Sequence, residues 1–93
     1  MEIATIMNDC FKWEYRLFKI QWEKTHEDER YSKDFYLEEM QRNLNLEKSM
    51  TKKIFFCLKI KKYRLIKYVL KTSFYYTQYR KTALAIWEEM TNA

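Results

Sequence analysis

The chain has neither glycine nor proline in its 93 residues, and this absence narrows the possible folds more than any other feature. Glycine usually supplies positive φ angles, and proline usually supplies rigid turns. Tight β-hairpins depend on glycine-containing turns, so we expect no β-sandwich, β-barrel or doubly wound α/β fold. Helices joined by polar capping residues need neither residue. The sequence therefore predicts one all-α domain over residues 1–93, a small bundle of three or four helices.

The same absence excludes several catalytic motifs. The phosphate-binding P-loop, the dinucleotide-binding fingerprint and the nucleophile elbow of hydrolases are all built on glycines. The single histidine, His26, lies in a polar stretch, and it is far in sequence from both cysteines, Cys10 and Cys57. A structural zinc site needs four ligands at close spacing. We expect no catalytic residue, no metal site and no cofactor, and we expect that the protein is not an enzyme.

The apolar runs are short. The run from Ile54 to Leu58 is as long as any, ends at Lys59 and falls far short of the roughly 20 residues that cross a bilayer. The first ten residues contain no lysine or arginine, unlike a secretory signal. These features predict a cytoplasmic, intracellular protein with no integral membrane segment. Cys10 and Cys57 are expected to be buried free thiols. A disulfide between them is possible only if the fold brings their Cα atoms within about 7 Å.

The first two helices are expected from periodicity and capping. A helix over about residues 2–24 places Phe11, Tyr15, Phe18 and Trp22 on one face. Further apolar residues surround that cylinder, so we expect this helix to be central in the bundle. Thr25 or Ser32 can cap a second helix over about residues 33–44.

The second half of the chain allows two interpretations. Apolar residues from Ile54 to Met90 keep one helical phase. A break near Thr72-Ser73 would give a four-helix bundle, and we favour it slightly because very long helices are uncommon. The alternative is one helix over about residues 51–90, whose exposed apolar side would predict a homodimer.

Charge is distributed unevenly along the chain. Residues 1–47 contain seven basic and eleven acidic side chains, whereas residues 48–93 contain eleven basic and two acidic ones. No carboxylate side chain lies between Glu47 and Glu88. The two halves could neutralise each other across the bundle, yet eleven cations in an acid-free window leave a surplus of positive charge. This window, residues 48–87, is called the acid-free window below.

The acid-free window interleaves cations with aromatic residues, which is typical of surfaces that bind acidic partners. We expect partner binding by ten residues: Lys52, Lys53, Phe55, Phe56, Lys59, Lys62, Tyr63, Arg64, Lys67 and Lys71. The predicted function is that of a small adaptor or inhibitor, a regulator that docks on a larger macromolecular complex. One alternative is sequence-nonspecific nucleic-acid binding by the same surface. A second is a membrane-surface or immunity-type helical bundle.

Overall fold

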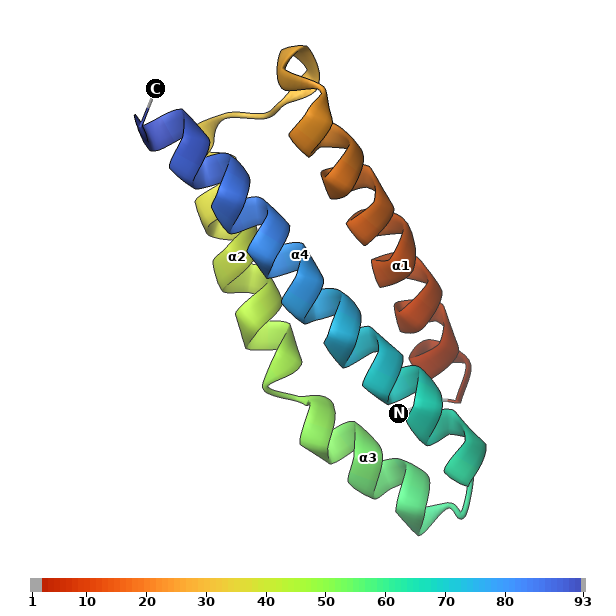
Figure 1. Ribbon diagram of the computed structural model, residues 1–93. Helices are drawn as coiled ribbons and strands as arrows, with labels where there is room; N and C mark the ends of the chain where they lie inside the picture. The colour runs from red at the N-terminus through yellow and green to blue at the C-terminus, as the bar shows by residue number, and fades with distance from the viewer. Residues whose placement is uncertain (1–2, 93) are drawn as a thin grey trace.

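The structure is a computed structural model that describes residues 3–92, and within this range it consists of helices joined by short connections, with no strand (Figure 1). The helices are α1 (Ile3–Thr25), α2 (Lys33–Glu47), α3 (Met50–Lys59) and α4 (Ile66–Asn92). Two short 3-10 turns, η1 (Glu27–Glu29) and η2 (Tyr63–Leu65), connect them. The predicted all-α bundle is confirmed. Glu2, the expected start of the first helix, lies outside the described residues.

Three rods form the bundle. Helices α1 and α4 run parallel to each other, while α2 and α3 follow one another along the opposite direction (Figure 1). Helix α4 contacts α1 on one side and α2 and α3 on the other, whereas α1 meets the α2–α3 rod at few points. The described chain measures 50 × 19 × 15 Å between Cα atoms. Helix α4 is therefore the central element.

The core lies on the faces that α1 and the α2–α3 rod turn toward α4. Trp13 of α1 packs edge-on against two tyrosines of α4, with ring centroids 4.7 Å from Tyr76 and 5.3 Å from Tyr79. Edge-to-face pairs of this kind stabilise a core beyond their buried area. The core also contains Ile6, Leu17, Ile20, Tyr36, Met50, Cys57, Leu65, Val69, Ala83 and Ile86. Both cysteines are free and buried, as expected.

A polar seam joins α2 to α4. The Tyr79 hydroxyl donates a 2.9 Å hydrogen bond to the buried Glu39 carboxylate. Arg80 donates to Asn43 Oδ1 at 2.7 Å and pairs with Glu47. The three α2 residues are four apart in sequence and so share one helical face. Buried polar groups need partners at defined positions, and the seam therefore sets the register between the two helices.

The prediction that α1 is central in the bundle was wrong. Phe11, Tyr15, Phe18 and Trp22 do share a face, but all four are exposed. The buried face of α1 is instead the line from Ile6 to Ile20. Helix α1 has two apolar faces, and only one of them is covered, because α1 lies at the side of the bundle. The central position that we expected for α1 belongs to α4.

The predicted break was also misplaced. Helix α4 continues through Thr72 and Ser73, and the chain reverses at residues 60–62 instead. Thr72 Oγ1 donates to the Tyr68 carbonyl at 2.7 Å, and Ser73 Oγ donates to Glu47 at 3.3 Å. Both hydroxyls therefore bond within or across helices, and neither caps a new helix. The single helix over residues 51–90 does not form, so the dimer that depended on it has no basis.

The second helix follows the prediction closely. The Ser32 side chain accepts a hydrogen bond from the Phe35 backbone N–H, which confirms it as the cap of α2. The helix continues three residues past the expected end, to Glu47. Its buried line contains Tyr36, Glu39 and Asn43, whereas the apolar residue Leu44 is exposed. The polar seam explains why polar residues are buried here, since Glu39 and Asn43 face α4 and bond to it.

Lys61 makes the reversal between α3 and α4 in a left-handed conformation, with φ at 58°. This conformation costs a side-chain-bearing residue about 1–2 kcal/mol, and glycine adopts it freely. We expect Lys61→Gly to raise the free energy of unfolding by about 0.5–1 kcal/mol in urea denaturation. The control is Lys62→Gly, at φ −99°, which should lower that free energy. Equal effects of the two changes would contradict the conformational argument.

The polar seam gives a second prediction. Tyr79→Phe removes the hydroxyl that bonds to buried Glu39, and we expect a loss of about 1–3 kcal/mol in the free energy of unfolding. Tyr63→Phe removes the hydroxyl of a tyrosine that is 60% exposed, and it should change stability by less than about 0.5 kcal/mol. Urea denaturation of both variants at neutral pH tests this difference. Matching losses would show that the seam has no special role.

Candidate interaction surface

The structure brings the ten predicted partner-binding residues to one end of the bundle. Five of them lie on α3, three on the connection and η2, and two on the first two turns of α4 (Figure 1). Eight are exposed: Lys52, Phe55, Lys59, Lys62, Tyr63, Arg64, Lys67 and Lys71. Both interpretations of the second half of the chain kept residues 52–71 on one continuous helix. The reversal at residues 60–62 places them on a hairpin instead.

Two of the ten residues face inward. Lys53 Nζ lies 3.3 Å from Asp9 Oδ2 of α1, and the Lys53 side chain is only 13% exposed. Phe56 is half-buried and packs against the core. Both sit on the side of α3 that approaches the rest of the bundle. They support the shape of this end and present little surface to a partner.

Most cations of the acid-free window have no acidic partner among residues 3–92. Of the eleven, Lys53 pairs with Asp9 and Arg80 pairs with Glu47. The other nine are all exposed: Lys48, Lys52, Lys59, Lys61, Lys62, Arg64, Lys67, Lys71 and Lys81. Neutralisation by the acidic first half therefore accounts for two of eleven cations. The rest of the positive charge faces solvent.

The densest part of this charge surrounds the hairpin between α3 and α4. We call Lys59, Lys61, Lys62, Arg64 and Lys67, together with Tyr63, the cationic end. A hollow of about 400 Å³ beside it is lined by Ile3 and by residues 61–65. The parallel arrangement of α1 and α4 brings both helix N-termini to this end, where their dipoles add positive potential. Neither first turn contains an acidic residue in the described range.

Lys61 was not among the ten predicted residues. It lies inside a run of basic residues, and only its left-handed backbone sets it apart. No glycine or asparagine marks the reversal, so the sequence carries no turn signal at this point. Ile3 likewise joins the hollow only through the packing of α1 against η2.

The opposite end of the bundle is acidic. It holds Glu27, Asp28 and Glu29 in η1, with Glu88 and Glu89 near the end of α4 (Figure 1). Arg30 Nη2 lies 2.8 Å from Glu89 Oε2 and ties η1 to α4. The molecule is therefore electrically polar along its long axis. A negatively charged partner is attracted to the cationic end and repelled from the other.

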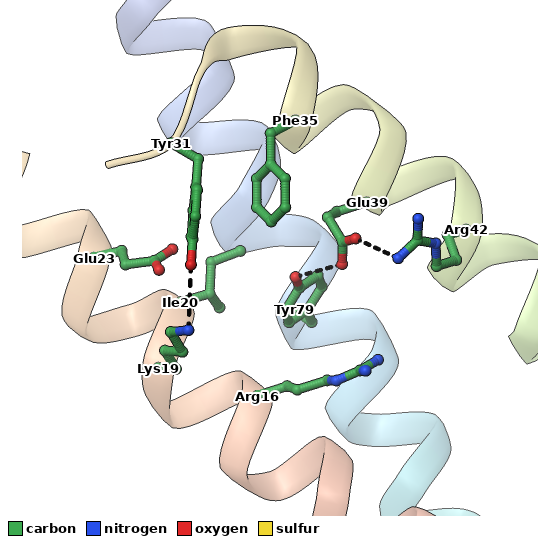
Figure 2. A pocket seen from close by; sticks show the side chains of 9 residues that line it. All are labelled: Arg16, Lys19, Ile20, Glu23, Tyr31, Phe35, Glu39, Arg42 and Tyr79. Carbon is green, nitrogen blue, oxygen red and sulfur yellow. Dashed lines mark hydrogen bonds and ion pairs between the residues drawn. The ribbon is translucent and has the colours of Figure 1, made fainter. Parts of the chain in front are cut away.

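A smaller pocket of about 190 Å³ lies between α1, α2 and α4 (Figure 2). Its lining includes Arg16, Lys19 and Arg42 together with the buried carboxylates of Glu23 and Glu39. Arg42 Nη1 bonds to Glu39 at 2.9 Å, and Lys19 Nζ donates to the Tyr31 hydroxyl at 3.3 Å. These groups largely satisfy one another. The pocket therefore acts as a polar junction that holds the helices together.

Cys57 and His26 are the side chains to consider for reactive chemistry in the described residues. Burial raises the pKa of the Cys57 thiol, which disfavours the nucleophilic thiolate. His26 is exposed, and its ring stacks on Trp22 at a centroid distance of 3.9 Å. No group of three or more His, Cys, Asp or Glu side chains within residues 3–92 is placed to hold a metal ion.

Comparison of the chain with family models, with curated proteins and with solved structures gives no match. Across residues 3–92, no helix has both the length and the apolarity needed to span a bilayer.

Glu23 provides a pH test of the polar junction. Burial raises the pKa of its carboxyl above the ordinary value of 4.5. The folded chain therefore binds this proton more tightly than the unfolded chain, and the ionised carboxylate lowers stability at neutral pH. That loss is recovered as pH falls through the raised pKa. Glu23→Gln cannot titrate, so its stability advantage over the wild type should be greatest near pH 7 and should shrink toward pH 4.5.

Urea denaturation at several pH values measures the advantage of Glu23→Gln. The control is Glu14→Gln, which removes a carboxylate at an exposed position of the same helix. An advantage for Glu23→Gln that stays constant or grows as pH falls would contradict the assignment.

Proposed function

We propose that this protein is a non-enzymatic interaction module, an adaptor or inhibitor that docks its cationic end on an acidic surface of a larger protein complex. One observation carries the proposal. Nine of the eleven cations in the acid-free window are exposed and have no carboxylate partner within residues 3–92. Seven of these nine lie on α3, on the connection or on the first two turns of α4.

The conformation and the charges of the cationic end lower the stability of the fold. Lys61 occupies a left-handed conformation that glycine would adopt without strain. The positive charges of Arg64 and Lys67 lie at the N-terminus of α4, where acidic residues would be more favourable. Clustered like charges also repel one another. Unfavourable local arrangements of this kind concentrate at functional sites, which supports a binding role for this end.

Two exposed aromatic side chains accompany the cations. Phe55 is 64% exposed and Tyr63 is 60% exposed. Tyrosine and arginine are common among residues that dominate binding energy at protein interfaces. The cross-section of the bundle is 19 × 15 Å, and the far end is acidic. These dimensions and this polarity favour a compact acidic patch with an apolar pocket over a long polyphosphate chain lying along the rod.

Charge reversal tests the proposal. We expect Lys59→Glu, Lys62→Glu and Lys67→Glu in one chain to abolish capture of a partner from lysate of the native host. The control reverses three remote exposed lysines, Lys24, Lys48 and Lys81, and therefore changes net charge equally. The control should retain the partner, because its cationic end is intact. Loss of capture in both variants would show that only net charge matters.

The same assay separates protein from nucleic acid. Nuclease treatment should leave capture unchanged if the partner is a protein surface. Loss of capture after nuclease, together with a steep salt dependence of binding to DNA or RNA, would instead establish the nucleic-acid function.

Tyr63 tests the aromatic contribution to the proposed contact. We expect Tyr63→Ala to weaken binding to the isolated partner by about tenfold or more, as for a residue that fills an interface pocket. Leu84→Ala, at an exposed position far along α4, is the control and should bind like the wild type. Isothermal titration calorimetry measures both dissociation constants. Unchanged affinity for Tyr63→Ala would remove it from the contact.

A further inference from the structure

The outer face of α1 carries an aromatic stripe that nothing in the described chain covers. Its residues are Phe11, Tyr15, Phe18 and Trp22, which are between 42% and 67% exposed. At 100° per residue they lie within about 60° of one another and about 150° from the buried line of α1. The stripe is therefore separate from the core, and α1 separates it from the α2–α3 rod. It also lies on a different rod from the cationic end.

Both ends of the aromatic stripe are held in place. The Phe11 ring lies edge-on to Tyr68 of α4, at a centroid distance of 6.3 Å. At the other end, Trp22 stacks on His26, and His26 Nδ1 lies 2.8 Å from the Trp22 carbonyl oxygen. Side chains that are already ordered lose less entropy on binding. The two ends of the stripe are therefore preorganised for binding.

The spacing of the aromatic stripe matches the seam of a two-helix coiled coil. Its residues are four, three and four positions apart, which corresponds to heptad positions d, a, d and a. Lys12 and Lys19 then occupy the e positions, and Glu14 and Gln21 occupy the g positions. One flank of the stripe is thus basic, and the other is acidic and polar.

We propose that the occupant of the aromatic stripe is a second copy of this chain, with the two α1 helices packed in parallel. Parallel pairing places Glu14 beside Lys19 of the other copy, and symmetry forms this pair twice. Antiparallel pairing would instead place Lys12 beside Lys19 twice, which is repulsive. To form this pair, Lys19 gives up its exposed 3.3 Å hydrogen bond to the Tyr31 hydroxyl. The flanking charges therefore select a parallel dimer.

The available area supports a weak, reversible dimer. Aromatic side chains bury about 150–250 Å² each, so the exposed parts of the four rings amount to roughly 400–500 Å² per chain. Flanking residues bring the total for two chains to about 1,000 Å² or more, the lower range for specific interfaces. We expect a dissociation constant on the order of 10 µM.

A parallel dimer places two cationic ends side by side. Repulsion between them is limited because exposed charges farther apart than about 8 Å are largely screened at physiological salt. The dimer proposal does not depend on the proposed function, since it concerns a different surface.

Sedimentation equilibrium of the full chain at 5–500 µM (about 0.5 to 50 times the expected dissociation constant) tests self-association. We expect the mass to rise from 11.7 kDa toward twice that value. Phe18→Glu should keep the helical circular dichroism spectrum and remain monomeric. Phe55→Glu, at an equally exposed position on α3, should dimerise like the wild type. A chain that is monomeric at every concentration would overturn the proposal, and binding of that monomer to lipid vesicles would then identify the stripe as a membrane contact. A dimer that survives Phe18→Glu would also overturn it.

Charge exchange tests the orientation of the two helices. Glu14→Lys and Lys19→Glu should each weaken the dimer, by about two- to fivefold in dissociation constant, because each places like charges together. The double variant should recover wild-type affinity, because it restores the opposite charges in exchanged positions. In an antiparallel dimer, Lys19→Glu alone would strengthen association by relieving its contact with Lys12. That result would overturn the parallel arrangement.

Discussion

The burial of α4 between α1 and the α2–α3 rod is the contact on which the rest of the structure depends. The other elements pack mainly on α4, and the neighbouring rods touch one another at few points. Trp13 joins α1 to Tyr76 and Tyr79, while Glu39 joins α2 to that same Tyr79. Burial raises the pKa of Tyr76 to about 12, so this hydroxyl stays neutral over the physiological range. One helix thus organises both the apolar core and the polar seam.

This arrangement determines which surfaces remain available. Because α1 contacts α4 through one face, its second apolar face stays in solvent as the aromatic stripe. Because α1 and α4 run parallel, their N-termini meet beside the cationic hairpin, while η1 and the end of α4 form an acidic end. The molecule therefore offers two separate surfaces, one charged and one aromatic. We propose an acidic protein partner for the first and a second copy of the chain for the second.

Much of the candidate site was predictable from charge alone. An acid-free window with eleven cations cannot be neutralised locally, and eight of the ten predicted residues are exposed. The exceptions depend on packing. Lys53 turns toward Asp9, a residue 44 positions away, and no local pattern reports such a contact. Lys61 was missed because left-handed backbone is normally signalled by glycine or asparagine, and here a lysine adopts it.

The sequence by itself determined that the chain is helical, that Thr25 or Ser32 can cap the second helix and that positive charge gathers in the second half. These properties follow from backbone propensity, local hydrogen bonding and composition, which act over a few residues. Only the tertiary structure decided that α4 is central, that the chain reverses at residues 60–62 and that the aromatic face of α1 points outward. Those outcomes depend on which of two apolar faces finds a partner, and a helical pattern describes both faces equally well.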